Sequence, residues 1–128
     1  MPKKKRKIAL SDLQLAVMRV LWTRGEATIA EVVSDLQAKR GLAHSTVATL
    51  LLRLEKRGLL SKRREGRAYI YSTVLSEAEV KHSMVSDLIA SLFQGDSMEL
   101  LAHLVRSEEV KPADIAKIKA RIKESDRE

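Results

Sequence analysis

The stretch from residue 42 to residue 71, LAHSTVATLLLRLEKRGLLSKRREGRAYIY, constrains the fold more than any other part of the chain. Its first half predicts a helix over residues 44–57, because apolar residues recur at spacings of three and four and so form one buried face: Val47, Leu50, Leu51 and Leu54. Gly58 is expected to end this helix. The next two segments, LLSKRR and RAYIYS, contain strand-forming residues around a turn at Glu65-Gly66, which predicts a β-hairpin.

The opposite face of the predicted helix is short and mostly polar. At 100° per residue it carries Ser45, Thr49, Leu52 and Lys56, with Thr46 and Arg53 on its flank. The hairpin tip is basic, with Arg63, Arg64 and Arg67. A helix with such a face followed by a basic hairpin is typical of a winged helix-turn-helix, in which the helix enters the major groove of DNA and the hairpin contacts the adjacent backbone.

The preceding residues supply the rest of this domain. Capping boxes at Ser11–Gln14 and Thr28–Glu31 predict two more helices, and Ala27-Thr28 is expected to pair with the hairpin as a short extended link. We therefore predict a mainly α, α+β winged helix-turn-helix domain over residues 10–74. Tyr69 and Tyr71 are expected to pack on the recognition helix, with a hydrogen bond to phosphate as the alternative.

Residues 75–128 predict three further helices and a C-terminal α-helical dimerisation domain. Their apolar residues exceed what three isolated helices can bury, so packing against a second copy is expected, with folding back onto the first domain as the alternative. The candidate dimerisation residues are Val85, Leu88, Ile89, Leu92, Phe93, Leu100, Leu101, Leu104, Ile115, Ile118 and Ile122.

Charge is distributed unevenly. Residues 1–72 hold 16 Lys+Arg and 6 Asp+Glu, whereas residues 73–128 hold 8 and 11, which predicts that the first part meets a polyanion. Residues 1–9 are read as a basic arm whose PKKKRK segment follows DNA phosphates; a nuclear-import signal, an engineered tag and a solubilising tail are the alternatives. The arm's candidate contacts are Lys3, Lys4, Lys5, Arg6 and Lys7.

The composition argues against several classes of protein. There is no cysteine, and the three histidines are scattered, so neither a metal site nor a cofactor is expected. No catalytic triad, paired carboxylates or phosphate-binding glycine loop is visible, which argues against an enzyme. No apolar run is long enough to cross a membrane, and a cytoplasmic location is expected.

Four segments together resemble the BlaI/MecI penicillinase-repressor family, from about Leu10 to Ile122: LSDLQLAVMRVLW, TIAEVVSDL, TVATLLLRLEKRGLL and REGRAYIYSTVLSEAE. The resemblance implies a homodimeric transcriptional repressor of a palindromic operator on double-stranded DNA. In well-known members a membrane sensor protease responds to β-lactam antibiotics and the repressor is cleaved in its dimerisation region, which links the family to antibiotic resistance. A ligand-responsive regulator with a small molecule between its two domains, and a non-specific architectural protein, are the other hypotheses.

The chain departs from the family at three places. Many relatives begin the recognition helix with Ser-Pro-Lys-Thr-Val, where this chain has His44 and Ser45 at the Pro and Lys positions. His103-Leu104 stands where well-known members have an Asn-Phe cleavage site. The cysteine cluster of the copper-responsive branch is absent, which excludes copper sensing in that manner.

The site residues follow from the predicted helix and hairpin together with this resemblance. Thr46 and Thr49 are expected to contact bases, while Arg53, Lys56 and His44 are expected at phosphates, with Ser45 beside them. Leu52 either touches a thymine methyl or is an ordinary exposed leucine. One of Arg64 and Arg67 is expected at phosphate or in the minor groove.

Overall fold

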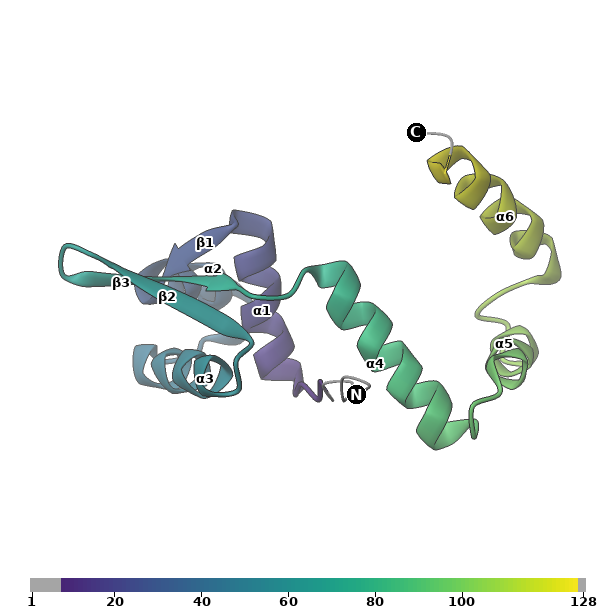
Figure 1. The fold of residues 1–128 in the computed structure, drawn as a ribbon, viewed down its shortest axis with the longest axis horizontal. Helices are drawn as coiled ribbons and strands as arrows, with labels where there is room; N and C mark the ends of the chain where they lie inside the picture. The colour runs from purple at the N-terminus through teal and green to yellow at the C-terminus, as the bar shows by residue number, and fades with distance from the viewer. Residues whose placement is uncertain (1–7, 127–128) are drawn as a thin grey trace, which may run out of the picture. The chain divides into compact units, whose positions relative to one another are not determined.

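The computed structural model describes residues 8–126, and its helices and strands follow the order expected for a winged helix with three further helices (Figure 1). The elements are α1 (Asp12–Arg24), β1 (Glu26–Thr28), α2 (Ile29–Arg40), α3 (His44–Lys56), β2 (Leu60–Glu65), β3 (Ala68–Thr73), α4 (Glu77–Leu92), α5 (Ser97–Arg106) and α6 (Pro112–Asp126). This confirms the predicted mainly α fold with a small sheet. The chain forms two compact units, of which the first runs to Met84 and the second begins at Val85.

The predicted capping boxes are present at the helix starts. The Ser11 hydroxyl accepts a hydrogen bond from the Gln14 backbone N–H, and the Gln14 side chain accepts one from the Ser11 N–H. Thr28 and Glu31 repeat this reciprocal arrangement at the start of α2. Each pair satisfies two backbone donors that a helix start leaves without an intrahelical partner. These local bonds explain why the starts of α1 and α2 were readable from sequence.

The sheet is antiparallel, with strand order β1-β3-β2. The Ala27-Thr28 link pairs with Tyr71 and Ile70 of β3, as predicted. The hairpin turn lies one residue later than expected: Glu65 pairs with Ala68, so Gly66 and Arg67 are the two central residues of the turn. Gly66 has φ of 60°, a value that glycine adopts without strain and that is typical of the first central residue in a type II′ turn. Arg67 therefore sits in the turn itself.

One hydrophobic core joins the helices of the first unit to the sheet. It is built mainly from the inward faces of α1, α2 and α3, with Tyr71 from β3: Val17, Met18, Leu21, Val32, Leu36, Val47, Leu51 and Leu54. Ile8 is also buried in this core, so the residues packed against the domain begin inside the stretch assigned to the basic arm. Residues 3–7, which carry the arm's cations, lie outside the described residues.

The first unit also includes the start of α4. Val80 is buried in the core, and the indole Nε1 of Trp22 donates a hydrogen bond of 3.0 Å to the Leu75 carbonyl. These two contacts hold the segment after β3 against α1. The unit therefore reaches Met84, ten residues beyond the boundary that we expected after residue 74.

An ion-pair group ties the end of α1 to α2. The Arg24 guanidinium donates to both carboxylate oxygens of Asp35, at 2.6 and 2.7 Å, and to Glu31 at 3.1 Å. The hydrogen bonds from Arg24 lower the pKa of the Asp35 carboxyl. The pKa of Glu31 is lowered as well, first by its hydrogen bond from the Thr28 backbone.

Asp35→Asn should therefore destabilise the protein at neutral pH but not in acid. A carboxyl whose pKa is lowered in the folded state stabilises the fold above its unfolded value of about 3.9, and this stabilisation is lost as pH falls through the folded pKa. We expect the melting temperatures of the parent and variant proteins to differ at pH 7 and to converge as pH falls through the folded pKa of Asp35, below its unfolded value. A difference that persists undiminished to low pH would contradict an ionised Asp35 as its source.

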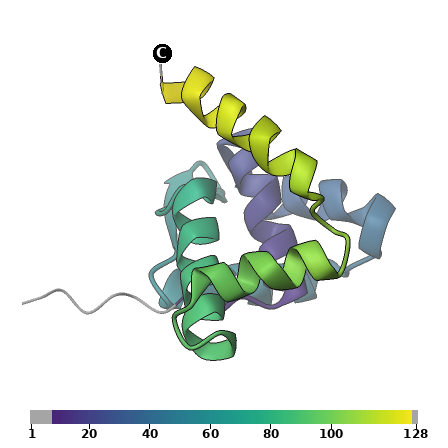
Figure 2. The same ribbon diagram turned by 90° about the vertical axis from the view of Figure 1, so that its right-hand side faces the viewer.

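The apolar side chains of the second unit are either exposed or only partly buried. Figure 2 shows α5 and α6 as separate helices joined by a short connection, and neither contains a buried residue within the described chain. Of the predicted dimerisation residues, five are exposed: Val85, Leu88, Leu92, Ile118 and Ile122. The other six are partly buried: Ile89, Phe93, Leu100, Leu101, Leu104 and Ile115. None of the helices between residues 8 and 126 is long and apolar enough to cross a membrane.

Candidate DNA-binding surface

The recognition helix α3 is anchored along one face and terminated by glycine. Val47, Leu51 and Leu54 are fully buried. At its end, the N–H of Leu59 donates to the Leu54 carbonyl and the N–H of Gly58 donates to the Glu55 carbonyl, the pair of bonds of a Schellman motif. Gly58 adopts φ of 78°, which a residue with a side chain rarely tolerates. The chain can therefore reverse directly from α3 into the wing.

The predicted contact residues of α3 are all exposed. They are His44, Ser45, Thr46, Thr49, Leu52, Arg53 and Lys56. The side chains of Arg53 and Lys56 make no ion pair with any described residue, which leaves their charges for an outside partner. Ala43 precedes the helix and offers no side-chain hydrogen bond to its first turn. The structure thus brings the seven residues onto the solvent side of one helix.

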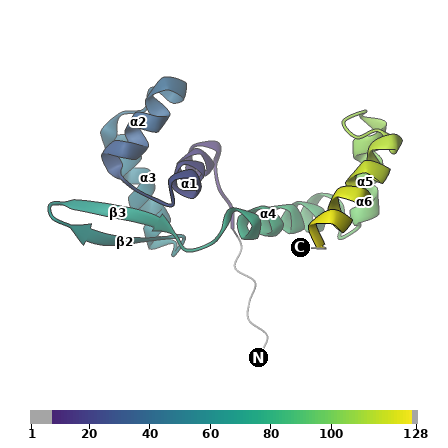
Figure 3. The ribbon, with the colours of Figure 1, turned by 90° about the horizontal axis from the view of Figure 1, so that it is seen from above.

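The wing is the β2–β3 hairpin, which projects beyond the helices of the first unit in Figures 1 and 3. Its three arginines have different surroundings. Arg63 is held by Glu26 of β1 at 2.9 Å and by Glu65 at 2.7 Å, and these carboxylates raise its pKa. Arg64 and Arg67 have no carboxylate partner among residues 8–126. Arg63 therefore fastens the wing to β1, and Arg64 and Arg67 remain for an anion.

Tyr69 and Tyr71 differ more than their alternation in the strand predicts. Tyr71 is 4% exposed and belongs to the core, as expected, but Tyr69 is 41% exposed. The Lys62 ammonium lies over the Tyr69 ring at 4.6 Å from its centroid, and the Arg64 guanidinium lies at 5.9 Å. Both distances suit a cation–π interaction. Both tyrosines were expected to pack on the recognition helix; Tyr71 lies in the core that α3 lines, whereas Tyr69 lies half-exposed on the wing, against the Lys62 and Arg64 side chains.

Lys62 is a candidate residue that the sequence reasoning missed. Its ammonium lies 3.4 Å from the Glu55 carboxylate, so it joins the wing to α3 while it covers Tyr69. The hairpin register is the sequence feature that relates Lys62 to Tyr69. Arg64 stands opposite Tyr69, and Lys62 stands two residues further along the same face. The link from Lys62 to Glu55 was not visible in the hairpin pattern, because it depends on how the wing packs against α3.

Glu55→Gln should strengthen binding to DNA of any sequence. Glu55 is the only carboxylate in α3, and its removal frees Lys62 for a phosphate and takes a negative charge from the surface. We expect affinity for random DNA to rise roughly threefold to tenfold at low salt, with a salt slope steeper by up to about one. Titrations at several salt concentrations measure both. Glu77→Gln, which breaks the exposed Glu77–Lys81 pair of α4, is the matched control and should leave the slope unchanged.

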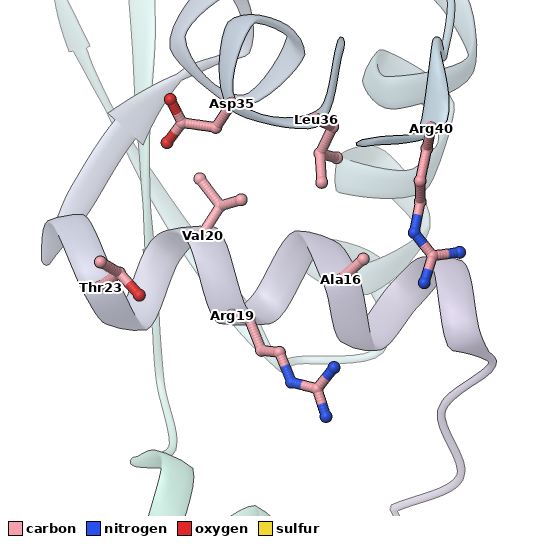
Figure 4. Close-up of a pocket in the computed structure, with 7 residues that line it drawn as sticks. All are labelled: Ala16, Arg19, Val20, Thr23, Asp35, Leu36 and Arg40. Atoms are coloured by element: carbon pink, nitrogen blue, oxygen red, sulfur yellow. The ribbon is translucent and has the colours of Figure 1, made fainter. Parts of the chain in front are cut away.

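A hollow of about 390 Å³ lies between α1 and α2. Figure 4 shows Ala16, Val20 and Leu36 along it, with Arg19 directed away from α2 and Arg40 at the far end. Asp35, which also borders it, is held by Arg24. All of these residues belong to the first unit, so the hollow does not support a ligand site between two domains.

No metal-binding cluster occurs in the part of the chain that the structure describes, since no three residues from His, Cys, Asp and Glu gather there. His82 and His103 are both exposed, and the His103 ring lies 6.0 Å from that of Phe93. The arrangement of α3 and the wing suits contact with an extended anion.

Comparison with known proteins identifies the family of this chain. The family described as Penicillinase repressor matches residues 10–124. The chain belongs to the penicillinase repressor family. The BlaI transcriptional regulator of Mycobacterium tuberculosis is 38% identical over 98 residues, covering 75% of this chain and 71% of that protein.

Two solved structures are similar to the first unit of this family member. The DNA-binding domain of the repressor BlaI gives a TM-score of 0.53 at 33% identity, covering 59% of this chain and 92% of that one. Monomeric BlaI of Bacillus licheniformis in complex with the blaP half-operator gives 0.51 at 32% identity, covering 58% and 90%. These relatives confirm the BlaI/MecI resemblance and the winged-helix fold. The protein is accordingly a DNA-binding transcriptional repressor and not an enzyme.

Proposed function

We propose that this repressor binds a palindromic operator as a homodimer, with α3 of each subunit in a major groove and its wing along the adjacent backbone. The observation that carries the proposal is the exposed outer face of α3, which has free cations in its last turn and a basic wing directly after it in the chain. The BlaI complex with a half-operator supports one subunit for each half-site. Half-sites should then be spaced by about one helical turn of DNA or a multiple of it.

The contacts divide by chemistry. Arg53, Lys56 and His44 bind phosphates and set the position of α3, while Thr46 and Thr49 face base edges, with Ser45 beside them. In the wing, Arg64 and Arg67 bind phosphate or enter the minor groove. Lys62 adds a third cation when a phosphate replaces Glu55 as its partner. Phosphate contacts give most of the affinity, and the central residues of α3 give the sequence preference.

In this proposal, the second unit forms the dimer interface. The uncovered apolar residues of α4, α5 and α6 favour packing against a second copy, which would remove them from water. Two linked half-site contacts bind far more tightly than one, so cleavage or loosening of residues 76–122 would release the operator. For release by cleavage, the family resemblance implies a membrane sensor protease as the partner; the repressor itself is proposed to act in the cytoplasm.

Operator selection from a random DNA pool, repeated at two salt concentrations, tests the proposal. A dimeric repressor enriches a palindrome with a fixed half-site spacing at both concentrations. Enrichment of no motif, with affinity that falls equally for all sequences as salt rises, would instead indicate an architectural DNA-binding protein.

The basic arm makes a separate prediction. We propose that residues 2–7 follow the DNA backbone. Removal of residues 1–7 should lower affinity for specific and random DNA alike and should flatten the dependence of affinity on salt. Binding titrations of the shortened and full chains measure both slopes, and an unchanged slope would mean that the arm does not contact phosphate.

A further inference from the structure

Thr49 and Leu52 lie together at the centre of the outer face of α3, and we call this pair the methyl patch. Ser45, Thr49, Leu52 and Lys56 share that face, because their spacings of four, three and four keep them within one stripe of a helix. Side chains three residues apart on a helix are neighbours, with about 5–6 Å between their Cβ atoms. The stripe is therefore polar at its start, cationic at its end, and formed by the methyl patch in between.

The Thr49 hydroxyl uses its hydrogen inside the helix. It donates to the carbonyl oxygen of Ser45 at 2.9 Å, one turn earlier. A hydroxyl has only one hydrogen, so the exposed part of Thr49 offers a methyl group and the oxygen lone pairs but no donor. In this conformation Thr49 is suited to an apolar partner or to a base that donates.

Leu52 has no structural role that explains its position. It is 42% exposed, whereas its neighbour Leu51 is fully buried, and it belongs neither to the core nor to the residues packed against it. A single exposed leucine is common and by itself indicates nothing. Its place beside the Thr49 methyl, on the face that carries the candidate DNA contacts, indicates a shared partner.

The chemistry of the major groove identifies that partner. Among the four bases only thymine presents a methyl group there, while guanine is read by Arg or Lys and adenine by Asn or Gln. α3 contains no Asn or Gln, and its cations lie in the last turn, away from the centre. The centre of α3 therefore lacks the bidentate side chains that read guanine or adenine, and the methyl patch matches the methyl group that thymine displays.

We propose that the methyl patch selects thymine in each operator half-site by contact with its 5-methyl group. This inference rests on the proposed operator binding and names the base feature that the recognition helix reads. Thr49 and Leu52 are thus specificity-determining residues, and the phosphate contacts of Arg53 and Lys56 bring them to the groove.

Substitution of thymine by uracil tests the proposal on the full-length protein, because uracil lacks only the 5-methyl group. Each thymine of the selected operator is replaced in turn, symmetrically in both half-sites, and the dissociation constant is measured. Loss of one buried methyl group weakens binding about fourfold, so a symmetric replacement at the recognised position should cost about fifteenfold. The other thymines should show little effect.

Protein variants then assign the effect to the patch. In Leu52→Ala and Thr49→Ser, which remove methyl groups, the uracil penalty at that position should fall below about threefold, since the contact is already lost. Thr49→Val removes the hydroxyl but keeps a methyl and should keep the penalty. Val74→Ala, at an exposed apolar residue after β3, is the matched control and should also keep it. Thermal melting confirms that each variant is folded.

The outcomes separate the two proposals. A selected palindrome that binds equally well with uracil at every position overturns the methyl patch and leaves the repressor function standing. A uracil penalty that is undiminished in Leu52→Ala and Thr49→Ser also overturns it, because other residues must then make the contact. Failure to select any motif overturns operator binding and the methyl patch together.

Discussion

Replacing Leu92 by glutamate should convert the repressor into a monomer and weaken its binding to the palindrome by about 100-fold or more. Leu92 is 68% exposed at the end of α4 and is one of the apolar residues proposed to meet a second copy. A carboxylate buried there without a partner costs much more than the apolar contact gains. Analytical ultracentrifugation measures the oligomeric state, and titration with the selected operator measures the affinity.

Ala90→Glu provides the matched control for Leu92→Glu. Ala90 is exposed on the same helix, and its replacement adds the same charge, but the helical spacing of α4 turns position 90 away from Val85 and Leu92. The Ala90→Glu protein should remain dimeric and bind the operator almost normally. A dimer that survives Leu92→Glu would mean that this face of α4 is not the interface.

Leu51→Ala should lower the free energy of unfolding by about 3 kcal/mol, whereas Leu52→Ala should change it by less than about 0.5 kcal/mol. The two substitutions remove the same atoms from adjacent positions of α3. Leu51 is fully buried and its loss leaves a cavity between the helices, but Leu52 faces solvent. Denaturant titration followed by circular dichroism measures both changes.

Among folded molecules, the order of the two effects should be reversed: operator binding should suffer more from Leu52→Ala than from Leu51→Ala. Leu51→Ala leaves the outer face of α3 intact, so folded molecules should keep the operator preference, while Leu52→Ala should lose affinity for the thymine-containing site. Equal destabilisation by the two substitutions would contradict the orientation of α3, in which Leu51 is buried and Leu52 is exposed.

Several features of the fold were predictable because they depend on neighbouring residues. The spacing of Val47, Leu51 and Leu54 predicted both the extent of α3 and the side that it buries. Ser11 and Thr28 predicted the starts of α1 and α2, because a capping box is complete within four residues. From these elements the winged-helix order followed, and with it the exposed contact residues of α3.

The details of the wing were less predictable. The turn was placed one residue early, and in a hairpin such a shift changes which residues stand opposite each other. Lys62 was not recognised as the residue that joins Glu55 to Tyr69, because that link depends on how the wing packs against α3. Similarly, the end of the first unit depends on the contacts of Trp22 and Val80 with parts of the chain that lie far away in sequence.

By itself the sequence determined the helices, their buried faces, the family and the excess of positive charge on the first part of the chain, because periodicity, caps and composition are local properties. Only the tertiary structure decided which charges remain available to DNA. Arg24 pairs with Asp35 across 11 positions and Arg63 pairs with Glu26 across 37, whereas Arg53, Arg64 and Arg67 find no carboxylate among residues 8–126. An ion pair depends on the distance between two side chains in space, and that distance is set only when the elements pack together.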